Sequence, residues 1–247
     1  MKRLMIFGSL CLTLLLTPSC DTLQQIAGDV VKTGTSGQSG LTNGEVISGL
    51  KEALNIGIGN SVNVASLVGG FLNNSQIRLP FPKDAEAVKD YALKIGLQGQ
   101  VTKFEETLNH AAEEAAKSAL PIFKNAITGM TIQDGFQILN GGNGAATNYL
   151  KNATRSQLVS AFSPIVEKAI DKVQLTKLWE PIVSKYNLAA PILGKPKVNE
   201  DLNAYVTGKA IDGLFVLVAQ EENKIRTNVN ARVTDLLKKV FGSIGKN

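Results

Sequence analysis

Residues 201–226 read DLNAYVTGKAIDGLFVLVAQEENKIR, and they decide between a helical and a mixed fold. The segment 213–219 inside this stretch is apolar enough to be a buried strand. It belongs, however, to a longer run that contains no proline, and no other segment offers a convincing partner strand. Apolar residues are also too continuous here for a helix with one wet face. We therefore expect residues 202–225 to form a central helix, with Leu214 and Phe215 in the core.

Four capping-box patterns indicate helix starts elsewhere in the chain. In such a box, a threonine hydroxyl and a polar side chain three residues later satisfy exposed backbone N–H groups at the start of a helix. The boxes begin at Thr42, Thr102, Thr131 and Thr154, and each is followed by apolar residues at helical spacing. The helix after Thr131 should end at Gly141. The pattern predicts an all-α fold, a single domain in which several helices form a bundle around the central apolar helix.

Two segments are expected to connect helices. Residues 77–82 read IRLPFP, and the two prolines forbid a helix, so we expect an extended connector. Residues 140–147 are rich in glycine and precede an expected helix, where free N–H groups are able to hold an anion. They lack the lysine and hydroxyl of a phosphate-binding loop and follow no strand. A turn between two helices is the simpler interpretation.

The first 19 residues have the pattern of an export signal. Lys2 and Arg3 precede an uncharged run over residues 4–16, which is too short to span a bilayer comfortably. Residues 16–20, LTPSC, resemble a bacterial lipobox, although the leucine usually lies one position nearer to the cysteine. In a lipobox the cysteine is acylated and becomes the first mature residue. Acylation of Cys20 would give stable anchoring, and secretion with a free thiol is the alternative.

The chain accordingly divides into three parts. Residues 1–19 are expected to be a signal peptide, residues 20–40 a lipidated cysteine with a flexible tether, and residues 41–245 a helical domain. Small polar residues make up the second half of the tether, which suits a flexible chain. The predicted location is the periplasmic or cell-surface face of a bacterial membrane, with the choice between inner and outer membrane left open.

The charge balance gives little support to nucleic acid as a partner. The chain has a formal charge of +5, which becomes +3 without Lys2 and Arg3. Residues 224–246 are more basic, because six cationic side chains stand there against Asp235 alone. A stretch of this kind is commonly a solvated helix face, and it is also able to meet an anionic lipid surface. Since export removes the chain from nucleic acid, we expect the membrane as a partner, through the anchor at Cys20.

Composition excludes several classes of protein. Apolar residues form 44% of the chain and charged residues 19%, which is enough for a core and unlike a disordered chain. The two cysteines, Cys11 and Cys20, do not make a disulfide scaffold. The one histidine, His110, cannot supply a multi-histidine metal site, and residues 110–114 lack the second histidine of a metalloprotease helix. We expect no metal and no cofactor.

Short blocks along the chain match one bacterial family. They include FLNN at 71–74, LNHAAE at 108–113, MTIQD at 130–134, AATNY at 145–149, DGLF at 212–215 and TDLLKKVFG at 234–242. With these blocks in register, the chain from residue 41 to residue 242 resembles the exported bacterial family catalogued as domain of unknown function 4197. The resemblance implies one helical domain in the cell envelope, and it implies no activity.

Charged residues near these blocks are candidate ion-pair or pocket residues, namely Asp134, Asp212, Glu222, Arg226 and Asp235. Glu222 and Arg226 stand four positions apart, which places them on one helix face as a pair. Asp212 lies in the apolar part of the central helix and would need a partner if buried. Paired carboxylates hydrolyse glycosidic bonds in other proteins, but no spacing here is diagnostic. No residue is assigned a catalytic role.

Two functions follow from this pattern of anchor, tether and core. The sequence favours a lipid-anchored envelope protein that is not an enzyme and that binds a protein partner or an apolar ligand, or has a structural role. The alternative is an envelope-directed hydrolase that uses paired carboxylates. A closed bundle would favour the first function, and a deep cleft with two facing carboxylates would favour the second.

Overall fold

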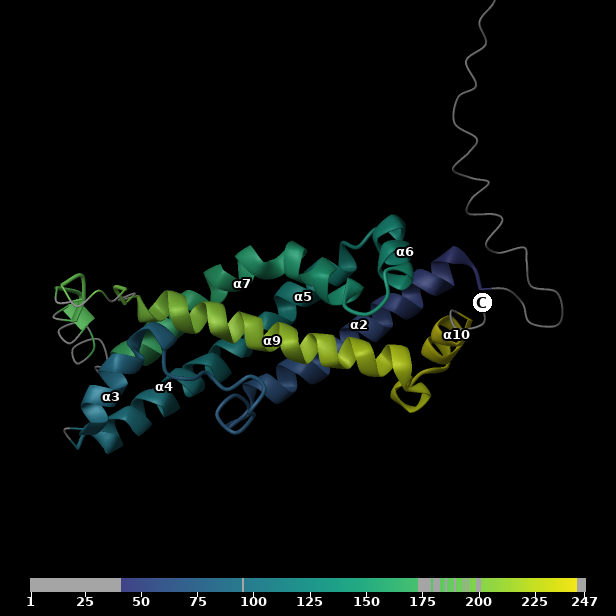
Figure 1. Cartoon of the computed structure of the whole chain (residues 1–247). Coiled ribbons are helices and arrows are strands. Elements are labelled where there is room, and N and C mark those ends of the chain that lie inside the picture. The colour runs from purple at the N-terminus through teal and green to yellow at the C-terminus, as the bar shows by residue number, and fades with distance from the viewer. Residues whose placement is uncertain are drawn as a thin grey trace, which may run out of the picture. The chain divides into compact units, whose positions relative to one another are not determined.

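The structure is a computed structural model that describes residues 41–94, 96–172, 179, 183–184, 186–188, 190–192, 194, 196–198 and 201–243. The expected signal peptide, Cys20 and the tether lie outside the described residues. The described helices are α2 (Asn43–Ser66), α3 (Glu86–Lys94), α4 (Gln98–Ala116), α5 (Ala119–Thr128), α6 (Ile132–Asn140), α7 (Ala145–Lys172), α9 (Leu202–Thr227) and α10 (Asp235–Ser243), with the short 3₁₀ helices η1 (Lys83–Ala85) and η2 (Val229–Ala231). No strand occurs among these residues, and the predicted all-α domain is confirmed (Figure 1).

Helix α9 is the central helix, as its apolar sequence predicts. It packs against α2, α4 and α7 at once, and Figure 1 shows it running along the middle of the bundle. Leu214 is fully buried and Phe215 is 5% exposed. By length and hydropathy, α9 is also the one described helix that would pass for a membrane span. In this fold its apolar side chains contact neighbouring helices instead.

Two glycines allow segments to approach these helices closely. At Gly213, in the middle of α9, an added Cβ would lie 2.8 Å from the ring of Phe71 and 3.2 Å from Ile77. The segment that follows α2 therefore packs directly on the α9 backbone. At Gly49, in the first half of α2, an added Cβ would lie 2.7 Å from Val240 of α10. The absence of a side chain at Gly49 therefore lets α10 pack beside the start of α2.

Two of the four predicted capping boxes are present and two are wrong. Thr42 and Thr131 each cap a helix, α2 and α6, through reciprocal bonds with the carboxylate three residues later. Helix α4, however, starts at Gln98, four residues before Thr102. Thr154 lies inside α7, where its hydroxyl donates to the Leu150 carbonyl at 2.7 Å. Threonine satisfies its hydroxyl in this way in a helix interior, so the sequence pattern alone does not mark a start.

Candidate functional site

The most highly connected charged group in the described structure is the Glu222 carboxylate on α9. Its side chain is 5% exposed and faces the first turn of α7. It accepts hydrogen bonds from the backbone N–H groups of Ala146 at 3.1 Å and Thr147 at 2.9 Å, and from the Thr147 hydroxyl at 2.7 Å. A helix start presents unpaired N–H groups and a partial positive charge. Glu222 therefore supplies α7 with its N-terminal cap from another helix.

Arg226, one turn later on α9, caps the C-terminal end of α6. Its Nε donates to Glu222 Oε1 at 2.9 Å, so the two side chains form the ion pair that their spacing allows. The guanidinium also donates to the carbonyls of Ile138 at 2.7 Å and Leu139 at 3.4 Å. These carbonyls belong to the last turn of α6, where a helix carries a partial negative charge. A cation is the group that this position favours.

Together these contacts form what we call the helix-end clamp, the Glu222–Arg226 pair with the end of α6 and the start of α7. The carboxylate receives four hydrogen bonds, two on each oxygen, which uses all of its usual acceptor positions. Burial of an ion pair is costly unless its remaining polar groups are also satisfied. Because they are satisfied here, the clamp joins three helices, and Glu222 has no free lone pair for a proton or a metal.

A small cavity lies beside the clamp. It has a volume of about 30 Å³ and is lined by apolar side chains of α2, α7, α9 and α10, among them Leu54, Leu150 and Phe241. A cavity of this size holds roughly one or two water molecules. Ligand pockets are on the order of 300–1,000 Å³. The cavity is therefore too small for an acyl chain or another apolar ligand.

The three other predicted acidic residues have separate partners on separate elements. Asp134 closes the capping box of α6, and the hydrogen bond from the Thr131 side chain, with a second from its backbone, holds the pKa of Asp134 below its ordinary value. Asp212 is half exposed and pairs with Arg155 of α7 at 2.7 Å. Asp235 is exposed and pairs with Lys238 at 3.3 Å. Among the predicted residues, the structure thus brings Glu222 and Arg226 together and places the others apart.

A second buried polar group, which the sequence did not reveal, holds the connector 77–82. Asn109 of α4 is fully buried, accepts from the Leu79 N–H at 2.8 Å and donates to the Leu79 carbonyl at 3.0 Å. One amide side chain thereby satisfies both backbone groups of an extended residue. The connector is confirmed as non-helical. A polar residue within the apolar stripe of α4 is the sequence signal that could have pointed to Asn109.

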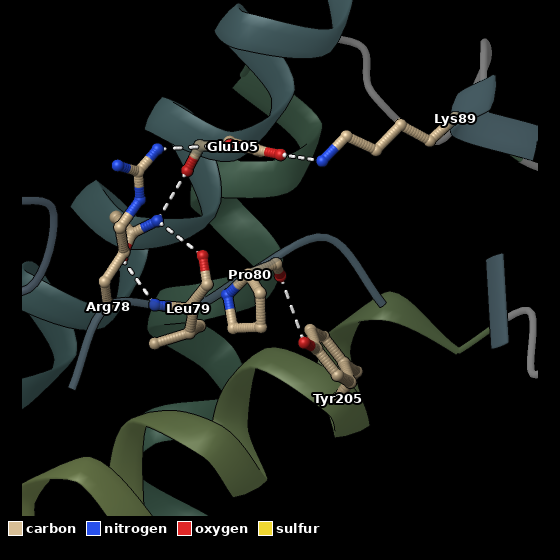
Figure 2. Close-up of polar contacts among 7 residues, drawn as sticks. Arg78, Leu79, Pro80, Lys89, Glu105 and Tyr205 are labelled. Atoms are coloured by element: carbon tan, nitrogen blue, oxygen red, sulfur yellow. Dashed lines mark hydrogen bonds and ion pairs between the residues drawn. The ribbon is translucent and has the colours of Figure 1, made fainter. Parts of the chain in front are cut away.

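Charged and aromatic side chains complete the attachment of this connector. Figure 2 shows Glu105 between Arg78 and Lys89. Arg78 Nη2 lies 3.1 Å from Glu105 Oε2, and Lys89 Nζ lies 2.9 Å from Glu105 Oε1. The Tyr205 hydroxyl of α9 donates to the Pro80 carbonyl at 3.1 Å. The pKa of Lys89 is raised chiefly by its hydrogen bond to Glu105. These contacts attach the connector to α4 and α9, so their role is to hold the fold together.

Glu113 of α4 fixes the loop that precedes this connector. Its buried carboxylate accepts from the N–H groups of Phe71 and Leu72, both at 3.1 Å, and His110 Nδ1 lies 2.7 Å from its other oxygen. His110 itself is half exposed. The only histidine of the chain therefore stands beside a carboxylate that is already occupied by a loop.

An open groove follows the end of α2, and we call it the 64–76 groove. Its volume is about 430 Å³, and its walls combine the exposed side chains of Val64, Leu67 and Val68 with the amides of Asn73 and Gln76. No charged residue lines it. Elsewhere in the described part of the chain, no group of three or more His, Cys, Asp or Glu side chains is placed to hold a metal ion.

Comparison with known proteins agrees with the helical domain and adds no chemistry. One family model, whose description is a protein of unknown function, matches residues 40–242. The chain matches no curated protein and no solved structure.

Proposed function

Because the chain belongs to the DUF4197 family, whose description assigns no activity, we propose its function from its own residues. It is a lipid-anchored protein of the bacterial cell envelope, held at Cys20 on the periplasmic or cell-surface face of a membrane. Its helical domain is a non-enzymatic binding or structural module that a tether of residues 21–40 holds near the lipid surface.

The sequence of the N-terminus supports the anchor. A short basic start, an apolar run and the lipobox-like residues 16–20 precede Cys20. A diacylglyceryl group on the sulfur, with a further acyl chain on the new amino terminus, meets the requirement of more than one lipid chain for stable attachment. The small polar residues that follow suit a flexible linker.

One observation carries the non-enzymatic part of the proposal, namely that the buried charged side chains are used to join helices. Glu222 and Arg226 are hydrogen-bonded to each other, and they also satisfy backbone groups at the start of α7 and the end of α6. Glu113 is occupied by two N–H groups of a loop. A general acid or base needs a free proton position within reach of a substrate, and the Glu222 carboxylate, which accepts four hydrogen bonds, does not offer one. The hydrolase alternative needs two carboxylates that face one cleft, and no observation on the described residues favours it.

The anchor is tested by labelling cells with a radioactive or clickable fatty acid. We expect the wild-type protein to incorporate the label and the Cys20→Ala variant to lose it, because the thioether-forming sulfur is gone. Cys11→Ala is the matched control, since it removes the other cysteine from within the signal and should keep the label. A wild-type protein without label, or a labelled Cys20→Ala variant, would refute the anchor.

A further inference from the structure

The loop between α9 and α10 exposes apolar side chains and buries its charged one. We call residues 228–234 the valine loop, and within it Val229 is 60% and Val233 64% exposed. Arg232, the only charged residue of the loop, is buried. A water-facing loop normally has the opposite arrangement. Apolar side chains that gather at a surface mark contacts with proteins or membranes, and two valines are exposed within this one loop.

Hydrogen bonds hold the valine loop in this inverted arrangement. Arg232 turns inward and donates to the carbonyls of Ile225 at 3.0 Å and Arg226 at 2.9 Å, and its guanidinium lies 5.8 Å from the centre of the Phe241 ring. The Asn228 side chain accepts from the Asn230 N–H at 2.9 Å. The exposure of the two valines is therefore a consequence of how the loop is built.

The valine loop lies at the end of the bundle where α2 begins (Figure 1). Helix α10 packs on the first half of α2, with Val240 against Gly49, and Lys239 lies close enough to Glu45 to interact electrostatically. Figure 1 shows η2, α10 and the start of α2 at the same end. A flexible chain with the length of residues 21–40 spans roughly 25 Å on average. An anchor at Cys20 would thus keep this end nearest to the lipid.

Two lysine side chains are exposed on the helix that follows the valine loop. Of the cations in residues 224–243, Arg226 and Arg232 are used inside the fold and Lys224 pairs with Glu221. Lys238 and Lys239 remain exposed on α10, where Asp235 pairs with Lys238 and Glu45 of α2 lies near Lys239. Exposed lysines beside apolar side chains are typical of segments that rest at a membrane interface.

We propose that the valine loop rests on the membrane that holds Cys20, with Val229 and Val233 at the boundary between headgroups and acyl chains and with Lys238 and Lys239 at the headgroups. The inference rests on the anchor proposed above. Two valines form a weak contact, too weak to recruit a free protein. Tethering makes the contact intramolecular, at an effective concentration that reaches the millimolar range for short linkers. The consequence is one preferred orientation of the domain.

The test uses the full mature protein with its lipid, reconstituted in vesicles of phosphatidylethanolamine and phosphatidylglycerol. Since Cys11 leaves with the signal and Cys20 is acylated, a single introduced cysteine is the only free thiol. An environment-sensitive fluorophore is attached to Val229→Cys, to Val233→Cys or, as a matched control, to Val68→Cys in the 64–76 groove, where Val68 is 92% exposed. All three positions are open to solvent, so the substitutions leave the core untouched.

We expect the emission at positions 229 and 233 to shift to shorter wavelength and to gain intensity on vesicles, and the emission at position 68 to stay unchanged. Unshifted emission at positions 229 and 233, on protein that remains bound to the vesicles, overturns the proposal and leaves the anchor standing. An equal shift at all three positions also overturns it, because the domain would then adsorb without orientation. Protein that leaves the vesicles refutes the anchor itself, and this inference with it.

Discussion

Glu222 and Arg226 act as caps for two helices to which neither of them belongs. The pair lies on α9, while its hydrogen-bond partners lie in residues 138–147. The geometry makes the removal of one charge expensive, because the other charge stays buried without compensation. The same reasoning does not apply to the half-exposed Asp212–Arg155 pair, which water and salt screen.

Replacement of Glu222 by glutamine should therefore destabilise the protein by about 3–5 kcal/mol, the range measured when one partner of a buried pair is removed. The amide has nearly the same shape, but it turns a donor toward the N–H groups of α7 and leaves Arg226 unpaired. Chemical denaturation measures the change in the free energy of unfolding. Asp212→Asn is the control, with an expected cost below about 1 kcal/mol. Equal costs for both variants would show that the clamp does not hold the helices together.

At the level of whole elements, α9 makes the strongest case for a core helix. Phe215 is 5% exposed and meets the Phe123 ring of α5 edge to face, with ring centres 5.7 Å apart. Its neighbour Val216 points outward and is 40% exposed. The two adjacent residues therefore report on a buried and an exposed face of one helix.

The variant Phe215→Ala should lose about 3–5 kcal/mol of stability, from lost burial and from the cavity that remains. Val216→Ala should change the free energy of unfolding by less than about 1 kcal/mol, as is usual at the surface. Denaturation curves of the two variants, recorded by circular dichroism, give both values. A Phe215→Ala cost as small as that of Val216→Ala would place Phe215 on an exposed contact surface instead.

The helices that were predictable from sequence are those with local signals. Continuous apolar residues mark α9, and the boxes at Thr42 and Thr131 mark α2 and α6. The starts of α4 and α7 were missed because they follow Gly96 and Gly144, which take a positive φ of 84° and 83° rather than forming a box. Glycine adopts this conformation readily, but a lone glycine also occurs in many loops.

The candidate site was predictable only in its local half. The spacing of Glu222 and Arg226 predicts an ion pair on one helix face, and Arg226 Nε does lie 2.9 Å from Glu222 Oε1. The partners in α6 and α7 lie 75 to 88 residues away in the chain, and Asn109 and Leu79 are 30 residues apart. Contacts of this range depend on how helices pack, and no local pattern carries them.

For the molecule as a whole, the interior and the surface differ in what they offer to a partner. The cavity beside the clamp has a volume of about 30 Å³, which is too small for an apolar ligand, and the buried Glu222 and Asn109 side chains have hydrogen-bond partners. Two apolar surfaces are exposed, the valine loop at the end where α2 begins and the 64–76 groove at the other end of α2. An envelope module held by its N-terminus would meet lipid with the first surface and leave the second open.

The proposed function depends most on the lipid anchor at Cys20, and intact-mass spectrometry of the protein extracted from bacterial membranes tests this anchor most directly. The predicted mass is that of residues 20–247 with a diacylglyceryl group on the Cys20 sulfur and an acyl chain on its amino group. Tandem fragmentation should place all of the added mass on Cys20. A mature chain that carries no lipid and has a free thiol at Cys20, or one that begins at another residue, would contradict the account.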